Sequence, residues 1–154
     1  MRYHAGVFTS VLCPVDFSEH SERALRCAID LAALSRAQLT IVTAVDPFMD
    51  AATAAAGHAE TLMQQTQNEL QQLLARVEDA ERRLAHTPSV AVVTGKPADA
   101  ILDQIAACGA DVVVMGTQGL SGTKRLFFGS TTEQVLRRSP VPVLAVPPAR
   151  GTEN

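Results

Sequence analysis

The sequence predicts an α/β fold, a five-stranded parallel open sheet with helices on both faces, and three observations support it. Short apolar runs alternate along the chain with longer segments of helical periodicity. Four of the runs are apolar throughout, as strands covered on both sides are. Glycine, aspartate and hydroxyl residues follow these runs, where open α/β sheets bind ligands. The 154 residues fit one domain, 1–154.

The first strand and helix are the clearest elements. Residues 8–15, FTSVLCPV, form a short apolar run that is typical of a buried strand. In the segment that follows, Leu25, Ala28 and Ile29 recur at helical spacing and mark one buried face. Ser18 is a suitable N-cap because its hydroxyl can accept from a free N–H of the first turn.

The middle of the chain is less regular. Residues 39–45, LTIVTAV, predict the second strand. The Ala-rich stretch 46–60 is weakly patterned, and we interpret it as a variable connection. About residues 59 to 85 predict one long polar helix whose buried face is marked by Leu70, Leu73, Leu74 and Val77.

The second half of the chain alternates clearly. Residues 89–94 predict the third strand, and a helix follows with Pro97 near its start and Gly109 just past its end. Residues 111–116 predict the fourth strand. A Gly-rich stretch then leads to a helix over 131–138, a last strand over 141–147 and an expected frayed tail, 149–154.

Composition excludes several classes of function. Hydrophobic residues make up 47% of the sequence and charged residues 19%, as in a globular chain. The net charge of −3 argues against a general nucleic-acid or membrane-surface role. We expect a cytoplasmic protein, because no signal-peptide pattern opens the chain and no apolar stretch approaches the roughly 20 residues that cross a bilayer.

Cysteine and histidine spacing predicts neither disulfides nor a structural metal site. Cys13, Cys27 and Cys108 are odd in number, widely spaced and set in apolar contexts. We therefore expect small buried side chains in a reducing compartment. The four histidines are scattered and show no HxxxH spacing.

The stretch MGTQGLSGTKRLFFGSTTEQVL, residues 115–136, is the best candidate for a ligand site. Gly116 ends the fourth strand, and a residue without Cβ lets a ligand lie against the backbone. Gly129 precedes Ser130 and Glu133, whose spacing predicts a capping box at a helix start. The free N–H groups and positive dipole end of such a helix form an anion site that suits a phosphate chain. The alternative is a surface loop ahead of a well-capped helix.

Two established nucleotide motifs are absent from the sequence. It contains no GxxxxGK[ST], so a Walker A loop is not supported. It contains no GxGxxG after the first strand, so a dinucleotide site of the Rossmann type is not supported either. Lys124 and Arg125 could add positive charge to the loop or simply keep it soluble, and their role stays open.

The spacing of Gly116, Gly119 and Gly129, followed by Ser130, resembles the signature of the nucleotide-binding branch of the universal stress protein family. Three longer segments also resemble that family. Its first strand and helix start are matched by CPVDFSEHSERAL, and its third strand through the glycine loop by VTGKPADAILDQIAACGADVVVMGTQG. Its last strand is matched by RRSPVPVLAVP. The resemblance implies a Rossmann-like sheet of strand order 3-2-1-4-5. That order would make the first and fourth strands neighbours.

The resemblance also implies an ATP site. Asp16 would accept hydrogen bonds from ribose hydroxyls or from the adenine side, and Pro14 would line the pocket. A carboxylate suits a vicinal diol as an acceptor, although a turn residue ahead of the helix is the alternative. Ala44 would place its backbone against the adenine. Met115 would pack near the base or the ribose, although a plain core position is equally consistent with it.

The phosphate side of the implied site is formed by backbone groups. Gly116, Gly119 and Gly129 would bring N–H groups to the phosphates, and Ser130 and Thr131 would add hydroxyl and backbone donors. AMP or a cyclic nucleotide could use the same cradle. Mg²⁺ is expected with a triphosphate, but no carboxylate cluster identifies a protein ligand for it.

The family's last strand commonly pairs with its copy in a second subunit, which implies a homodimer through residues 141–147. An exposed apolar edge strand needs cover, although flanking prolines could protect it instead.

Three hypotheses for the function remain. The first is a non-catalytic or very slowly hydrolysing regulatory protein that binds ATP in the stress response. The second is a slow ATPase or phosphotransferase, and the third is a dimeric scaffold that binds no nucleotide. We favour the first, because the loop contains no histidine or paired carboxylate to activate a nucleophile.

Overall fold

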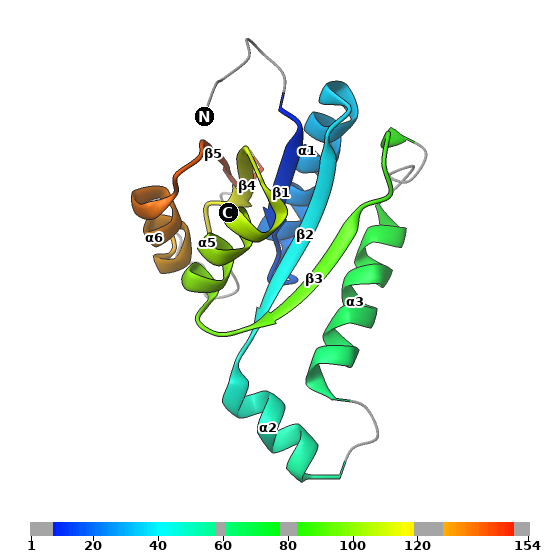
Figure 1. Ribbon diagram of the computed structural model, residues 1–154, viewed down its shortest axis with the longest axis vertical. Helices are drawn as coiled ribbons and strands as arrows, with labels where there is room; N and C mark the ends of the chain where they lie inside the picture. Colours follow the sequence, from blue (N-terminus) through cyan, green and yellow to red (C-terminus); the bar gives the residue numbers. More distant parts are fainter. Residues whose placement is uncertain (1–7, 58–60, 78–82, 119–127, 150–154) are drawn as a thin grey trace.

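The computed structural model describes residues 8–57, 61–77, 83–118 and 128–149. Five parallel strands form one sheet of order β3-β2-β1-β4-β5 (Figure 1). This confirms the predicted fold class and strand order. The strands are β1 (Ser10–Pro14), β2 (Gln38–Val45), β3 (Ser89–Thr94), β4 (Val112–Gly116) and β5 (Val143–Val146).

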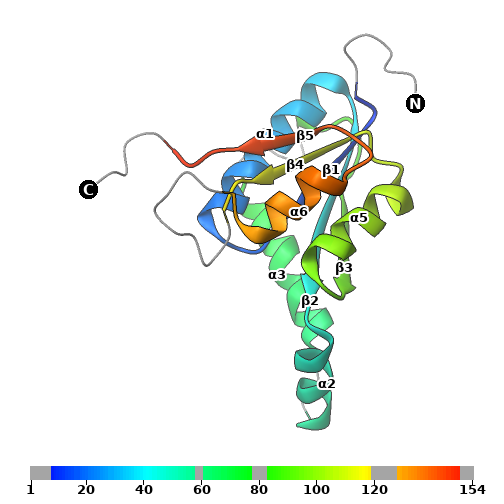
Figure 2. The same cartoon turned by 90° about the vertical axis from the view of Figure 1, so that its left-hand side faces the viewer.

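Helices cover both faces of the sheet (Figure 2). On one face lie α1 (Glu19–Ser35) and α3 (Leu62–Arg76), and on the other lie α5 (Pro97–Cys108) and α6 (Ser130–Arg138). Successive strand residues alternate between the two cores, as a pleated strand requires. Val11 packs with Leu25 of α1, whereas its neighbour Leu12 packs with Ile101 of α5.

Local signals for the helix ends are largely confirmed. Ser18 caps α1, and its hydroxyl accepts from Ser21 N at 3.1 Å. Pro97 begins α5, and Gly109 ends it with a left-handed backbone of φ +62°. At the amino end of the sheet, Asp111 accepts from the backbone N–H of Thr9 at 2.8 Å, which joins the starts of β1 and β4.

The middle of the chain contains one helix that was not predicted and one that is shorter than predicted. The connection 46–60 contains a helix, α2 (Pro47–Ala55), which Asp46 caps through a 2.8 Å bond from Phe48 N. None of the residues of this helix is buried. The long helix predicted for about residues 59 to 85 stops at Arg76, since Val77 has an extended backbone with φ −77° and ψ 112°.

The cysteines are free thiols. Cys13 is buried as predicted, and burial raises the pKa of its thiol. Cys27 and Cys108 are only half-buried. Burial, and then the nearby Asp30 carboxylate, raise the pKa of Cys27. Within the described residues, no helix combines the length and apolar character that crossing a membrane requires.

Gly116 at the end of β4 lies against the backbone of α1. A Cβ built on Gly116 would stand 3.0 Å from the His20 carbonyl oxygen and 3.1 Å from its carbonyl carbon. Real Cβ atoms rarely come this close to backbone, and backbone cannot rotate away as a side chain can. The absent Cβ therefore lets α1 pack closely on the end of β4.

We expect Gly116→Ala to destabilise the protein, because α1 would have to shift away from β4. Overpacking of this kind costs about 1 to 3 kcal/mol. Urea unfolding of the variant and the wild type would measure the difference. Equal midpoints with equal slopes would contradict the close approach.

Candidate functional site

A cavity of about 320 Å³ opens at the carboxyl end of the sheet, between β1, β2, β4 and the starts of α5 and α6. The neighbouring strands β1 and β4 lead to helices on opposite faces, so the cavity lies at the switch point of the sheet. It is lined by Pro14, Val15, Asp16, Ser21, Thr43, Ala44, Pro97, Ile101, Met115, Gly116, Gln118, Gly129, Ser130, Thr131 and Thr132.

Eight of the nine residues predicted for the site line this one cavity. The ninth, Gly119, lies outside the described residues, as do Lys124 and Arg125. The sheet order brings the predicted residues together from three strands and one helix. Their binding roles stay predictions. The eight residues are Pro14, Asp16, Ala44, Met115, Gly116, Gly129, Ser130 and Thr131.

The start of α6 differs from the prediction. Gly129 is the N-cap and Ser130 is already the first helical residue, so no side chain caps the helix. The predicted capping box of Ser130 and Glu133 is therefore wrong, and Glu133 instead forms an ion pair with Arg137 at 2.7 Å. A hydrogen bond from Gly129 N to Thr117 O, 2.8 Å long, places the helix start one residue earlier than predicted.

Two hydrogen bonds fasten the start of α6 to the end of β4. One is the bond from Gly129 N to Thr117 O. The other is donated by the buried hydroxyl of Thr132 to the carbonyl oxygen of Gly116, at 2.9 Å. Together they hold the helix end beside the cavity.

This arrangement leaves free donors at the cavity. The ladder of α6 begins with Glu133 N, which donates to Gly129 O at 2.9 Å. The N–H groups of Ser130, Thr131 and Thr132 therefore have no partner within the helix, and all three residues line the cavity. With the positive end of the helix dipole behind them, they form a site suited to an anion.

The carboxylate of Asp16 forms the turn ahead of α1, one of the two roles that the sequence left open, and the other stays a prediction. Its Oδ1 accepts from Ser18 N at 3.0 Å and from Ser18 Oγ at 2.5 Å, so it is a turn residue ahead of α1. Its own N–H donates to Ser21 Oγ at 3.2 Å. No hydrogen bond within the described residues uses Oδ2, and Asp16 lines the cavity. One carboxylate oxygen therefore remains available to a ligand.

The side of the cavity away from α6 is mostly apolar. Ala44 and Met115 were predicted there, whereas Thr43, Pro97 and Ile101 were not. Pro97 and Ile101 are four residues apart in the first turns of α5, so they share one helix face. That spacing is visible in the sequence, but which face meets the cavity depends on how α5 packs on the sheet.

The described lining of the cavity contains few charged side chains. Asp16 is the one ionisable side chain among the described lining residues. Within the described parts of the chain, no group of three or more histidine, cysteine, aspartate or glutamate residues could hold a metal ion. The polar character of the cavity comes mainly from backbone N–H groups and hydroxyls.

The universal stress protein family model matches residues 8–147. The Thermus aquaticus protein named universal stress protein in QAH/OAS sulfhydrylase 3' region is 31% identical over 148 residues, which cover 91% of this chain and 99% of that one. A crystal structure of a universal stress protein in complex with cAMP has a TM-score of 0.66 at 30% identity and covers 92% and 98% of the two chains. The universal stress protein from Archaeoglobus fulgidus in complex with dAMP has a TM-score of 0.60 at 20% identity, covers 91% and 98%, and shows the same fold. The chain belongs to the universal stress protein family.

Proposed function

We propose that this protein binds ATP in the cytoplasm and acts in the stress response as a nucleotide-responsive regulator that hydrolyses ATP very slowly or not at all. The observation that carries the proposal is the start of α6, where Ser130, Thr131 and Thr132 present free N–H groups to the cavity. Such donors recognise phosphate without any positively charged side chain.

The rest of the cavity suits the other parts of a nucleotide. The Oδ2 of Asp16, which no hydrogen bond within the described residues uses, is an acceptor for ribose hydroxyls, because a carboxylate oxygen can accept from two neighbouring hydroxyls. The apolar wall of Ala44, Pro97 and Ile101 suits the flat face of a base. In this arrangement the phosphates would lie at the start of α6, the ribose beside β1, and the base between β2 and α5.

The relative whose structure contains cAMP supports an adenine nucleotide in this cavity, at 30% identity over 92% of the chain. Backbone N–H groups and a helix dipole recognise a phosphate group without counting how many follow it. AMP or a cyclic nucleotide could therefore occupy the same cradle, and the affinities must be compared directly.

Mg²⁺ is expected to accompany ATP. The described lining contains a single carboxylate, Asp16, which is already engaged through Oδ1. This donor set fits a cation that keeps several waters and is held mainly by phosphate oxygens, as Mg²⁺ prefers.

Slow turnover follows from what the cavity contains. Asp16 is its one ionisable side chain among the described residues, and its position beside the turn suits the ribose better than a phosphate. Positioned donors without a base or a water-orienting group bind a triphosphate but do little to activate the attacking water.

We expect ATP to be released when the freshly purified protein is denatured, because the phosphate cradle is formed in the folded chain. Mass spectrometry identifies the ligand. Calorimetric titration of the nucleotide-free protein with ATP–Mg²⁺, AMP and cAMP then ranks the affinities. Gly129→Val should weaken all three, since the added side chain obstructs the entrance to the phosphate site. No nucleotide and no heat would favour the scaffold hypothesis.

Asp16→Asn separates the two roles of this side chain. The amide oxygen can still accept from Ser18, so the turn and the melting temperature should be kept, whereas the amide nitrogen cannot accept from ribose. We expect ATP affinity to fall about tenfold, the usual range for losing a hydrogen bond to a charged group. Asp103→Asn, an exposed change on α5, is the matched control. Unchanged affinity for ATP would remove Asp16 from the site.

The edge strand β5 supports a homodimer. It pairs with β4 on one side, and the described residues provide no strand for its other side. Leu144 is 42% exposed at this edge. Pairing with a second copy would satisfy the free backbone groups and cover apolar surface.

We expect light scattering coupled to gel filtration to give twice the chain mass of 16.4 kDa for the wild type. Leu144→Asp should give the single-chain mass, because it places two like charges near each other across the two-fold axis. Leu34→Asp, on the exposed surface of α1, is the matched control. A wild type of single-chain mass would contradict the dimer.

A further inference from the structure

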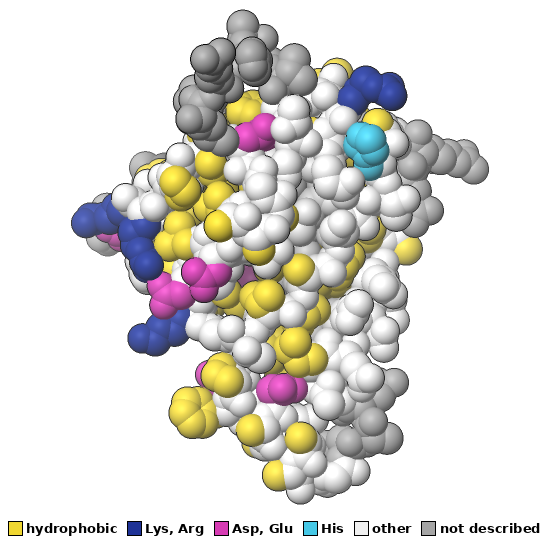
Figure 3. All heavy atoms as spheres, in the orientation of Figure 1, with side chains coloured by type: hydrophobic (Ala, Val, Ile, Leu, Met, Phe, Trp, Pro, Cys, Tyr) yellow, Lys and Arg dark blue, Asp and Glu magenta, His cyan; other side chains and the backbone are white. Residues whose placement is uncertain are grey.

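The helix α2 exposes an unusually apolar surface. None of its nine residues is buried, and Phe48 and Met49 are 85% and 60% exposed. In Figure 3, hydrophobic side chains gather on the lower part of the molecule, where α2 lies in Figure 1. Isolated helices shorter than about 12 residues are marginal in water. The helix would therefore become more stable if another group covered the side chains of Phe48 and Met49.

The helix is tethered to the mouth of the cavity. Ala44 lines the cavity, and α2 begins three residues later at Pro47. The four steps along the chain from Ala44 to Phe48 can span at most about 14 Å. The side chain of Phe48 is thus held within reach of whatever lies against Ala44.

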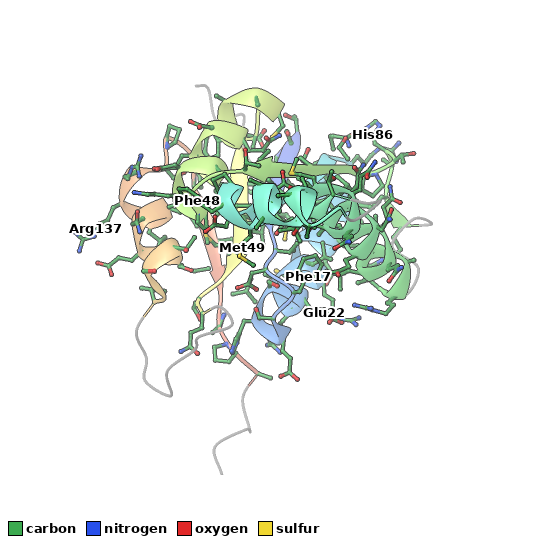
Figure 4. All side chains as sticks on the ribbon, turned by 90° about the horizontal axis from the view of Figure 1, so that it is seen from below. Phe17, Glu22, Phe48, Met49, His86 and Arg137 are labelled. Carbon is green, nitrogen blue, oxygen red and sulfur yellow. The ribbon has the colours of Figure 1, made fainter. Side chains whose placement is uncertain are left out.

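Packing beside α3 and few hydrogen bonds hold α2 in place. Among the described residues, the hydrogen bond that joins it to the rest of the structure runs from Met63 N to Asp50 Oδ1 and is 3.4 Å long. Figures 1 and 2 place α2 beyond the end of β2, below the sheet, and Figure 4, seen from below, shows Phe48 at the end of the helix on the side of α5 and α6. A rotation of α2 about Asp46 would move Phe48 toward the cavity without breaking the sheet, because β2 ends at Val45.

The cavity lacks the group that this helix carries. None of its described lining residues is aromatic. A purine whose one face rests on Ala44, Pro97 and Ile101 would leave its other face in water. Base–aromatic stacking is worth about tenfold in affinity or more by alanine substitution, and it tolerates different bases.

We infer that α2 is a cap for the purine base of the bound nucleotide, with Phe48 stacked on the outer face of the base and Met49 packed beside it. The inference rests on the proposed function, because it requires a purine nucleotide in the cavity. The short tether from Ala44 favours the base over a second protein chain as the group that covers α2.

The sequence contains no tryptophan, so Phe48→Trp introduces a single fluorescent reporter on α2. Leu34→Trp is the matched control, because Leu34 is 86% exposed on α1 and does not line the cavity. Acrylamide quenching is measured for both variants with and without ATP–Mg²⁺. Saturating ATP should lower the quenching constant severalfold for the tryptophan at position 48 and leave that at position 34 unchanged.

A second pair of variants tests the contribution to affinity. Phe48→Ser should weaken ATP binding about tenfold and leave the binding of inorganic triphosphate unchanged, because the latter has no base. The melting temperature should also stay unchanged, since Phe48 is almost fully exposed. Leu34→Ser should change neither affinity.

The outcomes separate the cap from the proposed function. If ATP binds the wild type but position 48 is quenched equally with and without it, the cap is wrong and ATP binding stands. The cap is also wrong if Phe48→Ser weakens ATP and inorganic triphosphate alike. Protection of position 48 that grows with protein concentration in the absence of nucleotide would identify a second copy as the cover. If ATP does not bind at all, both proposals fail.

Discussion

The candidate site depends on the attachment of α6 to β4. The hydroxyl of Thr132 donates to Gly116 O, and Gly129 N donates to Thr117 O, so the first turn of the helix is held beside the last residue of the strand. Three free backbone N–H groups acquire a fixed position by this means. Preorganised donors bind an anion without paying for their own reorientation, which is why backbone groups alone can suffice here.

The sheet order places the remaining groups around that helix end. Because β1 and β4 are neighbours, Asp16 and Gly116 reach the same cavity although a hundred residues separate them in the chain. The bond from Thr9 N to Asp111 joins the starts of the two strands, and the close contact of Gly116 with His20 joins their far ends through α1. On the side of β1 and β4, the floor of the cavity is therefore formed by two strands that are joined at both ends.

On the side of β2, the wall of the cavity is less firmly held. Val45 and Asp46 connect Ala44 to α2, which one hydrogen bond joins to α3 among the described residues and which exposes Phe48 and Met49. In the function that we propose, the helix end fastened to β4 would hold the phosphates, and a nucleotide bound there would change the protein surface by covering the apolar residues of α2. Such a change requires no catalysis, which is consistent with a cavity whose described lining has a single ionisable side chain.

The sequence by itself determined the features that depend on neighbouring residues. Alternating apolar runs predicted the strands, Ser18 and Gly109 marked helix ends correctly, and the family resemblance selected Asp16 and Gly129, which line one cavity. Only the tertiary structure decided where α6 begins, because Gly129 N donates to Thr117 O, twelve residues earlier in the chain, and no side chain caps the helix. It likewise added Thr43 and Ile101 to the cavity and left α2 uncovered, since these depend on how separate elements pack, and packing is not encoded in any short window of residues.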